Sequence, residues 1–149
     1  MTKVLLSLHV LAAVIAIGPV AVAASMFPPA LRRAAGSADM NANLPVLHRI
    51  CRVYAAVGLA VPIFGLATGA ALGVLGTGWL ITSIALTAAA AAILTTMILP
   101  DQRAALTTVA AGRVDATAAR LAMSAGIFNL LWAIVAVLMV VRPGSTTGV

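Results

Sequence analysis

The sequence predicts an all-α integral membrane protein, a four-helix bundle that forms a single transmembrane domain over residues 1–149. Of these residues, 63% are hydrophobic and only 8% are charged, and the mean hydropathy is +1.16. A soluble domain is about half apolar and about a quarter charged, so a soluble core could not hide this much apolar surface. Four apolar segments also have roughly the 20 residues that a membrane helix needs.

The first span is predicted over residues 4–31, which contain no Asp, Glu, Lys or Arg. Gly18-Pro19 lies inside it and predicts a bend, because proline removes one backbone donor from a helix. A cleaved secretory signal is the alternative, since Lys3 precedes the apolar run and Ala21-Val22-Ala23 resembles a cleavage site. The run is long for a signal core, so a membrane span is the preferred interpretation.

The second span is predicted over residues 53–75 and the third over residues 79–99. Only Gly76-Thr77-Gly78 separates them, so we expect a tight antiparallel hairpin. The loop before the second span contains Pro45 and is expected to be irregular.

Pro100-Asp101 is expected to end the third span, because proline disfavours helix in the preceding residue and Asp can cap the next helix. The fourth span is predicted over residues 121–141, ending before Arg142. The Ala-rich stretch from Asp101 to Arg120 favours a helical extension of the fourth span.

The basic residues predict the orientation, because Lys and Arg concentrate in short cytoplasmic loops. Seven of the nine flank the two longer loops: Arg32, Arg33, Arg49, Arg52, Arg103, Arg113 and Arg120. Lys3 and Arg142 lie on the other side. We therefore expect both termini on the outer side and two cytoplasmic loops. The richness in Ala, Val and Arg is typical of a GC-rich bacterial genome, which suggests the bacterial plasma (inner) membrane.

Small residues form the clearest packing signal. Gly65, Gly69 and Gly73 follow one another at four-residue spacing, with Gly58 seven residues earlier on nearly the same face. Such spacing lets another helix backbone approach closely. Two interpretations remain open: packing within the bundle, for example against the alanine run at residues 88–92, or docking of a second copy or another membrane protein.

His9 is the only ionisable residue within the apolar body of a predicted span, and such residues are functional candidates by default. It lies at a depth of roughly 8 Å, at about 1.5 Å per residue. It is either a neutral imidazole bonded to a neighbouring span or water, or a ligand of haem or a metal. His48 lies on the order of 20 Å away at the cytoplasmic edge, so the two histidines cannot share a site.

Further polar side chains are predicted in the outer half of the bundle or near its middle, where they could face His9: Ser7, Thr68, Ser83, Thr87, Asn129 and Trp132. Buried polar groups need partners, so these could pair or line a small pocket. Ser and Thr often bond their own helix backbone instead. The methionines Met26, Met97, Met123 and Met139 are interpreted as core or lipid-facing residues, with none paired to His9.

A basic rim of Arg32, Arg33, Arg49 and Arg52 could hold an anionic lipid headgroup, although topology alone also explains it. The single cysteine, Cys51, excludes an intramolecular disulfide and a thiolate zinc site. The spans contain no Asp, Glu, Lys or Arg, and the chain has no phosphate-binding or hydrolase motif. Ion-coupled transport and hydrolysis are therefore disfavoured.

The first span reads Leu8-His9-Val10-Leu11-Ala12-Ala13-Val14, with Gly18 four positions beyond. It resembles the L-H-x-L-a-a opening helix of a group of small bacterial membrane proteins. The group comprises an uncharacterised family of four-span proteins, the membrane domain of copper-resistance D-type proteins and, more remotely, the four-helix membrane protoporphyrinogen oxidase. The uncharacterised family is nearest, over most of the chain including Arg52-Val53-Tyr54-Ala55 and Gly58-Leu59.

The resemblance to the oxidase and copper proteins implies that His9 matches a first-helix histidine implicated in binding haem or a metal. The oxidase type is expected to carry a further basic residue inside the bundle, and this chain has none there. The resemblance therefore implies one candidate ligand and no activity.

Two function hypotheses follow. The first is a non-enzymatic accessory or assembly protein that uses the glycine face or the arginine rim. Its partners would be the lipid bilayer, a second copy or another membrane protein, and nucleic acid is not expected. The second is a haem- or copper-handling protein with His9 as ligand, and haem b or copper as cofactor. A small-solute transporter or channel remains a third alternative, supported only by the outer polar residues and by Pro19 and Pro62.

Overall fold

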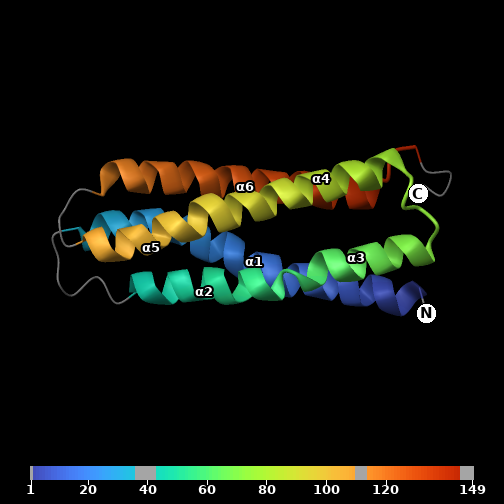
Figure 1. The fold of residues 1–149 in the computed structure, drawn as a ribbon, viewed down its shortest axis with the longest axis horizontal. Helices are drawn as coiled ribbons and strands as arrows, with labels where there is room; N and C mark the ends of the chain where they lie inside the picture. The colour runs from blue at the N-terminus through green and yellow to red at the C-terminus, as the bar shows by residue number, and fades with distance from the viewer. Residues whose placement is uncertain (1, 36–42, 110–113, 145–149) are drawn as a thin grey trace.

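The computed structural model describes residues 2–35, 43–109 and 114–144 (Figure 1). Within these ranges all regular structure is helical, and four helices are long and apolar enough to cross a membrane: Lys3–Ala34, Asn43–Ala71, Gly78–Thr108 and Asp115–Val141. The predicted all-α, four-helix membrane bundle is therefore confirmed.

The outer surface of the bundle carries large apolar side chains. Val14, Val137 and Val140 are 67%, 59% and 80% exposed. In water such a surface would be costly, whereas in a bilayer these side chains meet lipid of the same polarity. The surface pattern thus agrees with the hydropathy of the four helices.

The two described chain ends and the 72–77 turn lie at one end of the bundle, called here the terminal end (Figure 1). The other ends of the four membrane-length helices lie at the opposite end of the bundle, called the loop end. Both termini lie at the same end, as an even number of membrane crossings requires. Which end faces the cytoplasm remains a prediction.

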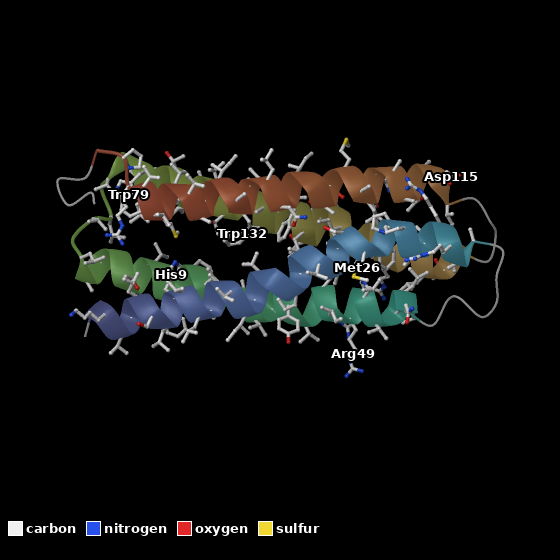
Figure 2. All side chains as sticks on the ribbon, turned by 180° about the vertical axis from the view of Figure 1, so that it is seen from behind. His9, Met26, Arg49, Trp79, Asp115 and Trp132 are labelled. Carbon is white, nitrogen blue, oxygen red and sulfur yellow. The ribbon has the colours of Figure 1, made fainter. Side chains whose placement is uncertain are left out.

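Helix α1 (Thr2–Ala34) extends the first span beyond its predicted bounds. It stays helical through Pro19, Pro28 and Pro29, so the expected bend at Gly18-Pro19 does not interrupt it. Figure 2 shows α1 running obliquely across the bundle. In this path it contacts α2 (Asn43–Val57), α3 (Ala60–Ala71) and α6 (Asp115–Val141), which makes it the central helix.

The second span is two helices rather than the continuous one expected over residues 53–75. Helix α2 begins at Asn43, so the region around Pro45 is helical and not irregular. Proline is tolerated there because the first turn of a helix needs no intrahelical donor.

The interruption between α2 and α3 falls at Gly58 and Leu59. Pro62 has no N–H with which to bond the Gly58 carbonyl four residues before it. The Val61 N–H bonds that carbonyl instead, at 3.1 Å, which tightens the turn. Pro62 therefore explains why the span is broken at this point.

The third span does not end at Pro100. It consists of α4 (Gly78–Ile93), a π-helical turn η2 (Leu94–Ile98) and α5 (Leu99–Thr108). The Leu99 N–H bonds the Leu94 carbonyl five residues back. The wider turn takes up the crowding that the Pro100 ring would cause in a regular helix, so the helix continues past proline.

Helix α6 ends at Val141 as predicted, where Arg142 turns left-handed with φ 45°. The helical extension expected over residues 101–120 is divided, with 101–108 in α5 and 115–120 in α6. Asp101 is not a helix cap but accepts two hydrogen bonds from Arg120, at 2.6 and 2.7 Å.

The prediction of a tight hairpin between the second and third spans is wrong. Helix α3 ends at Ala71 and α4 begins at Gly78, and the two helices contact each other only slightly. Helix α3 packs on α1, whereas α4 packs on α6. The two therefore diverge at the terminal end (Figure 1).

The tightly packed core is concentrated toward the loop end. Its largest fully buried side chains include Phe27, Leu31, Ile98, Leu121 and Phe128. Toward the terminal end, the divergence of α3 from α4 leaves space inside the bundle, and His9 lies there.

Candidate functional site around His9

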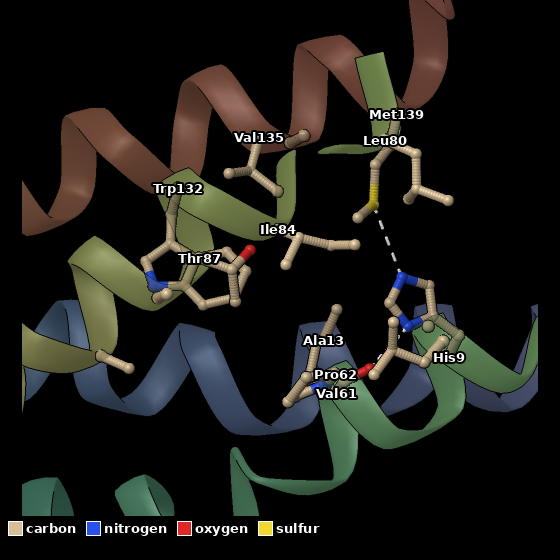
Figure 3. Close-up of a pocket in the computed structure, with 15 residues that line it drawn as sticks. His9, Ala13, Val61, Pro62, Leu80, Ile84, Thr87, Trp132, Val135 and Met139 are labelled. Carbon is tan, nitrogen blue, oxygen red and sulfur yellow. Dashed lines mark hydrogen bonds between the residues drawn. The ribbon is translucent and has the colours of Figure 1, made fainter. Parts of the chain in front are cut away.

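Two adjoining half-open cavities lie between α1, α3, α4 and α6. The deep cavity, of about 310 Å³, is shown in Figure 3 and reaches Trp132. The terminal cavity, of about 590 Å³, reaches Arg142. They share a lining made of His9, Ala13, Gly65, Leu80, Ala136 and Met139. Most of the lining is apolar, so the polar groups present define what the site can bind.

His9 projects from α1 and is only 7% exposed. Its Nδ1 lies 3.0 Å from the Val61 carbonyl oxygen of α3. A carbonyl oxygen only accepts, so Nδ1 carries the proton and donates it. In the neutral ring, Nε2 then presents a lone pair, which is the arrangement that metal-binding histidines use.

Met139 of α6 faces that nitrogen, with its Sδ 3.5 Å from His9 Nε2 (Figure 3). Because sulfur also only accepts, this contact is a hydrogen bond only when Nε2 carries a proton, and a neutral ring protonated at Nδ1 has none there. The expectation that no methionine pairs with His9 is therefore wrong. A signal was available, because Met139 precedes the end of its span by only two residues and so lies near the same membrane surface as His9.

Gly65 provides the space for the imidazole. A Cβ at this position would lie 2.9 Å from His9 Cε1 and 3.2 Å from Nδ1. Val61 and Gly65 are four residues apart, so they present the accepting carbonyl and the gap on one face of α3. The ring is thus held by one helical turn.

The expected glycine face does not form one stripe. Gly65 faces the His9 ring, and Gly69 faces the side chains of Leu75 and Leu80 rather than the alanine run. Gly73 lies beyond the end of α3 with φ +69°, and Gly58 lies in the break before it. The glycines are spaced for one helix face in the sequence, but only Gly65 and Gly69 lie within α3.

The hydroxyl groups of the predicted polar level mostly bond their own helices. Ser7, Thr68, Ser83 and Thr87 each donate to the carbonyl oxygen four residues earlier, at 2.7–2.8 Å. Of these, Thr68 lines the terminal cavity and Thr87 the deep cavity. They form no shared network with His9, as expected for hydroxyls in apolar helices.

Asn129 and Trp132 of α6 carry the polar atoms near the middle of the bundle. Asn129 Nδ2 donates to Ser25 Oγ at 2.9 Å. Trp132 lines the deep cavity, and its ring meets Phe128 edge to face at 6.3 Å. Among the described residues, the buried Trp132 Nε1 has no hydrogen-bond partner.

A second polar cluster lies near the loop end, away from the cavities. Gln102 of α5 is fully buried. Its Oε1 lies 3.1 Å from His48 Nδ1, and its Nε2 donates to Cys51 Sγ at 3.5 Å. The cluster joins α2 to α5. Sequence reasoning missed Gln102 because it ended the third span at Pro100.

The four arginines of the rim, Arg32, Arg33, Arg49 and Arg52, are all exposed toward the loop end. Arg49 points away from the bundle (Figure 2). Lipid headgroup contact at these residues remains a prediction.

The donor set at His9 limits the chemistry. In the part of the chain that the structure describes, no group of three or more His, Cys, Asp or Glu side chains could hold a metal ion. His9 and Met139 therefore offer one nitrogen and one sulfur. Comparison with family models, curated proteins and solved structures finds no match to this chain, so the resemblance of the first helix remains a prediction.

Proposed function

We propose that this protein binds haem b inside the bundle, with His9 as the iron ligand. The supporting observation is the buried imidazole whose Nδ1 is held by the Val61 carbonyl and whose Nε2 faces the cavity and Met139. A backbone carbonyl on the second ring nitrogen fixes the tautomer and orientation that ligation needs.

The number of donors favours haem over a bare copper ion. Imidazole and thioether also suit copper(I), and at this site they offer one nitrogen and one sulfur. Haem brings four nitrogen donors of its own and takes one or two axial ligands from the protein. The mostly apolar walls also suit a porphyrin.

Met139 would be the second protein ligand, because its Sδ lies 3.5 Å from His9 Nε2 and a thioether is a ligand that haem iron accepts. The two side chains touch in this structure, so a porphyrin would enter between them only after the flexible methionine side chain rotated away. Bound iron would supply one-electron chemistry, and this chain would shield it from water.

The assembly hypothesis loses its main supporting feature, because Gly65 and Gly69 already face side chains of this chain. No other described contact favours it over ligand binding.

The test is an absorption spectrum of detergent-purified protein, oxidised and dithionite-reduced, coupled to metal analysis. Wild type is expected to show Soret and α bands that His9→Ala abolishes. Met139→Leu should still bind haem, but the absorption spectrum should change because the iron loses its sulfur ligand. Ser7→Ala is the matched control, because Ser7 is exposed on the same helix and bonds only Lys3.

A colourless, metal-free wild type that does not take up added haem would overturn the proposal. Stoichiometric copper without a Soret band would show that the site binds a bare copper ion instead of haem.

A further inference from the structure

The terminal cavity ends at a positive charge. Arg142 lines it and is half-buried. The chain has three acidic residues, and the two in the described part, Asp101 and Asp115, begin or flank helices at the loop end. Among the described residues, the one ion pair joins Asp101 to Arg120. No described carboxylate therefore neutralises Arg142.

The Arg142 side chain is held in place by its neighbours. The left-handed backbone at this residue ends α6, with its N–H bonded to the Leu138 carbonyl at 3.0 Å. Its Nε donates to the Met139 carbonyl at 3.2 Å. The guanidinium carbon lies 5.9 Å from the centre of the Trp79 ring, a cation–π distance. Within the described residues, the terminal Nη groups have no hydrogen-bond partner.

Trp79 supports Arg142 at the same cavity. It lines the terminal cavity beside Arg142, and its buried Nε1 has no hydrogen-bond partner in the described part of the chain. This N–H is covered by protein atoms and does not face the open cavity. The Trp79 ring instead holds the Arg142 guanidinium over its face, and the guanidinium supplies the donors that suit a carboxylate.

We propose that Arg142 and Trp79 form a carboxylate subsite, and that the cavity binds an apolar molecule that carries a carboxylate at the terminal end. The inference rests on the proposed function for its first ligand, haem, whose propionates are carboxylates on an apolar body. A fatty acid from the bilayer offers the same chemistry. In either case the charged group lies at the membrane surface and the apolar part lies inside, which avoids burying the charge.

The test compares each ligand with its ester, because the ester removes only the negative charge. Haem and haem dimethyl ester are titrated into detergent-purified wild type, Arg142→Gln, Trp79→Phe and Arg49→Gln. Arg142→Gln should weaken haem binding about tenfold or more and leave the dimethyl ester within about twofold. Trp79→Phe should act in the same direction, more weakly. Arg49→Gln, an exposed arginine at the loop end, should change neither affinity.

The outcomes separate the subsite from haem binding itself. Haem that binds wild type and Arg142→Gln equally, or a variant that loses acid and ester alike, overturns the subsite and leaves the proposed function standing. If wild type binds neither haem nor its ester, a fluorescent long-chain fatty acid and its methyl ester are titrated instead. Acid binding lost in Arg142→Gln then supports the subsite with a fatty acid as ligand, and unchanged binding overturns it.

Thermal unfolding followed by circular dichroism accompanies each titration. If Arg142→Gln does not fold, Trp79→Phe and Arg142→Lys take its place. Trp79→Phe must then selectively weaken binding of the acid, and Arg142→Lys must keep part of the preference for acid over ester.

Discussion

At the scale of single residues, the position of the His9 ring depends on one glycine. Glycine in a helix interior costs about 1 kcal/mol relative to alanine. At Gly65 this cost makes room for the His9 ring, since a Cβ would lie 2.9 Å from Cε1. The absent side chain lets the imidazole reach the Val61 carbonyl. Four-residue glycine spacing correctly indicated close approach, but what approaches Gly65 is a side chain rather than a helix backbone.

Gly65→Ala is expected to weaken haem binding while changing the free energy of unfolding only slightly. The gain in helix propensity and the loss of the His9–Val61 hydrogen bond are each about 1 kcal/mol and have opposite signs. The free energy of unfolding in detergent should therefore change by less than about 1 kcal/mol. Haem affinity should fall at least about tenfold, because the ring is displaced.

Gly126→Ala on α6 is the control, because no atom lies within 4 Å of the added Cβ. It should leave haem affinity unchanged. A Gly65→Ala protein that binds haem as tightly as wild type would contradict the assigned role of this glycine.

At the scale of elements, two interruptions change the spans. Pro62 breaks the second span at Gly58 and Leu59, and a π turn before Pro100 keeps the third span helical to Thr108. Both follow from a proline, whose ring lacks an N–H and crowds the carbonyl four residues earlier, yet the results are opposite. A tightened turn separates α2 from α3, whereas a widened one joins α4 to α5.

The continuation past Pro100 brings Asp101 to Arg120, which ties α5 to α6. We expect Asp101→Asn to lower the free energy of unfolding by up to about 1 kcal/mol, since Arg120 is largely exposed and solvent screens the pair. Added salt should weaken wild type toward the variant. Equilibrium unfolding in detergent at low and high salt measures both effects. Equal salt dependence in the two proteins would show that the pair contributes nothing.

At the scale of the whole molecule, the bundle is solid toward the loop end and hollow at the terminal end. Phe27, Leu31 and Ile98 fill one end, and the other opens because α3 follows α1 while α4 follows α6. The packed end can hold the fold while the hollow end leaves room for the proposed ligand. The charged residue of the cavity wall lies at its terminal end, next to the membrane surface.

Reporter fusions test the orientation that the arginines predict. Alkaline phosphatase fused after Val149 is expected to be active, because it folds only outside the cytoplasm, and green fluorescent protein there should stay dark. Fusions within residues 36–42 should behave in the opposite way. A fluorescent C-terminal fusion would reverse the orientation and place Arg142 and the cavity mouth at the cytoplasmic surface.

The sequence by itself determined the class of protein, the number of spans and the end of the fourth helix. These features depend on hydropathy, which adds up along the chain without reference to distant residues. Single-residue chemistry also identified His9 as the candidate ligand, because ionisable groups within apolar spans are costly.

Only the tertiary structure decided what His9 meets. Its partners Val61 and Met139 lie 52 and 130 residues away in sequence, and such contacts depend on how each helix is rotated about its axis. Each residue added to or removed from a helix turns the following face by about 100°. The break at Gly58 and the π turn at Leu94–Ile98 both change that rotation. The periodicity of each helix could therefore be read from the sequence. Which face of each helix points toward His9 was decided by packing.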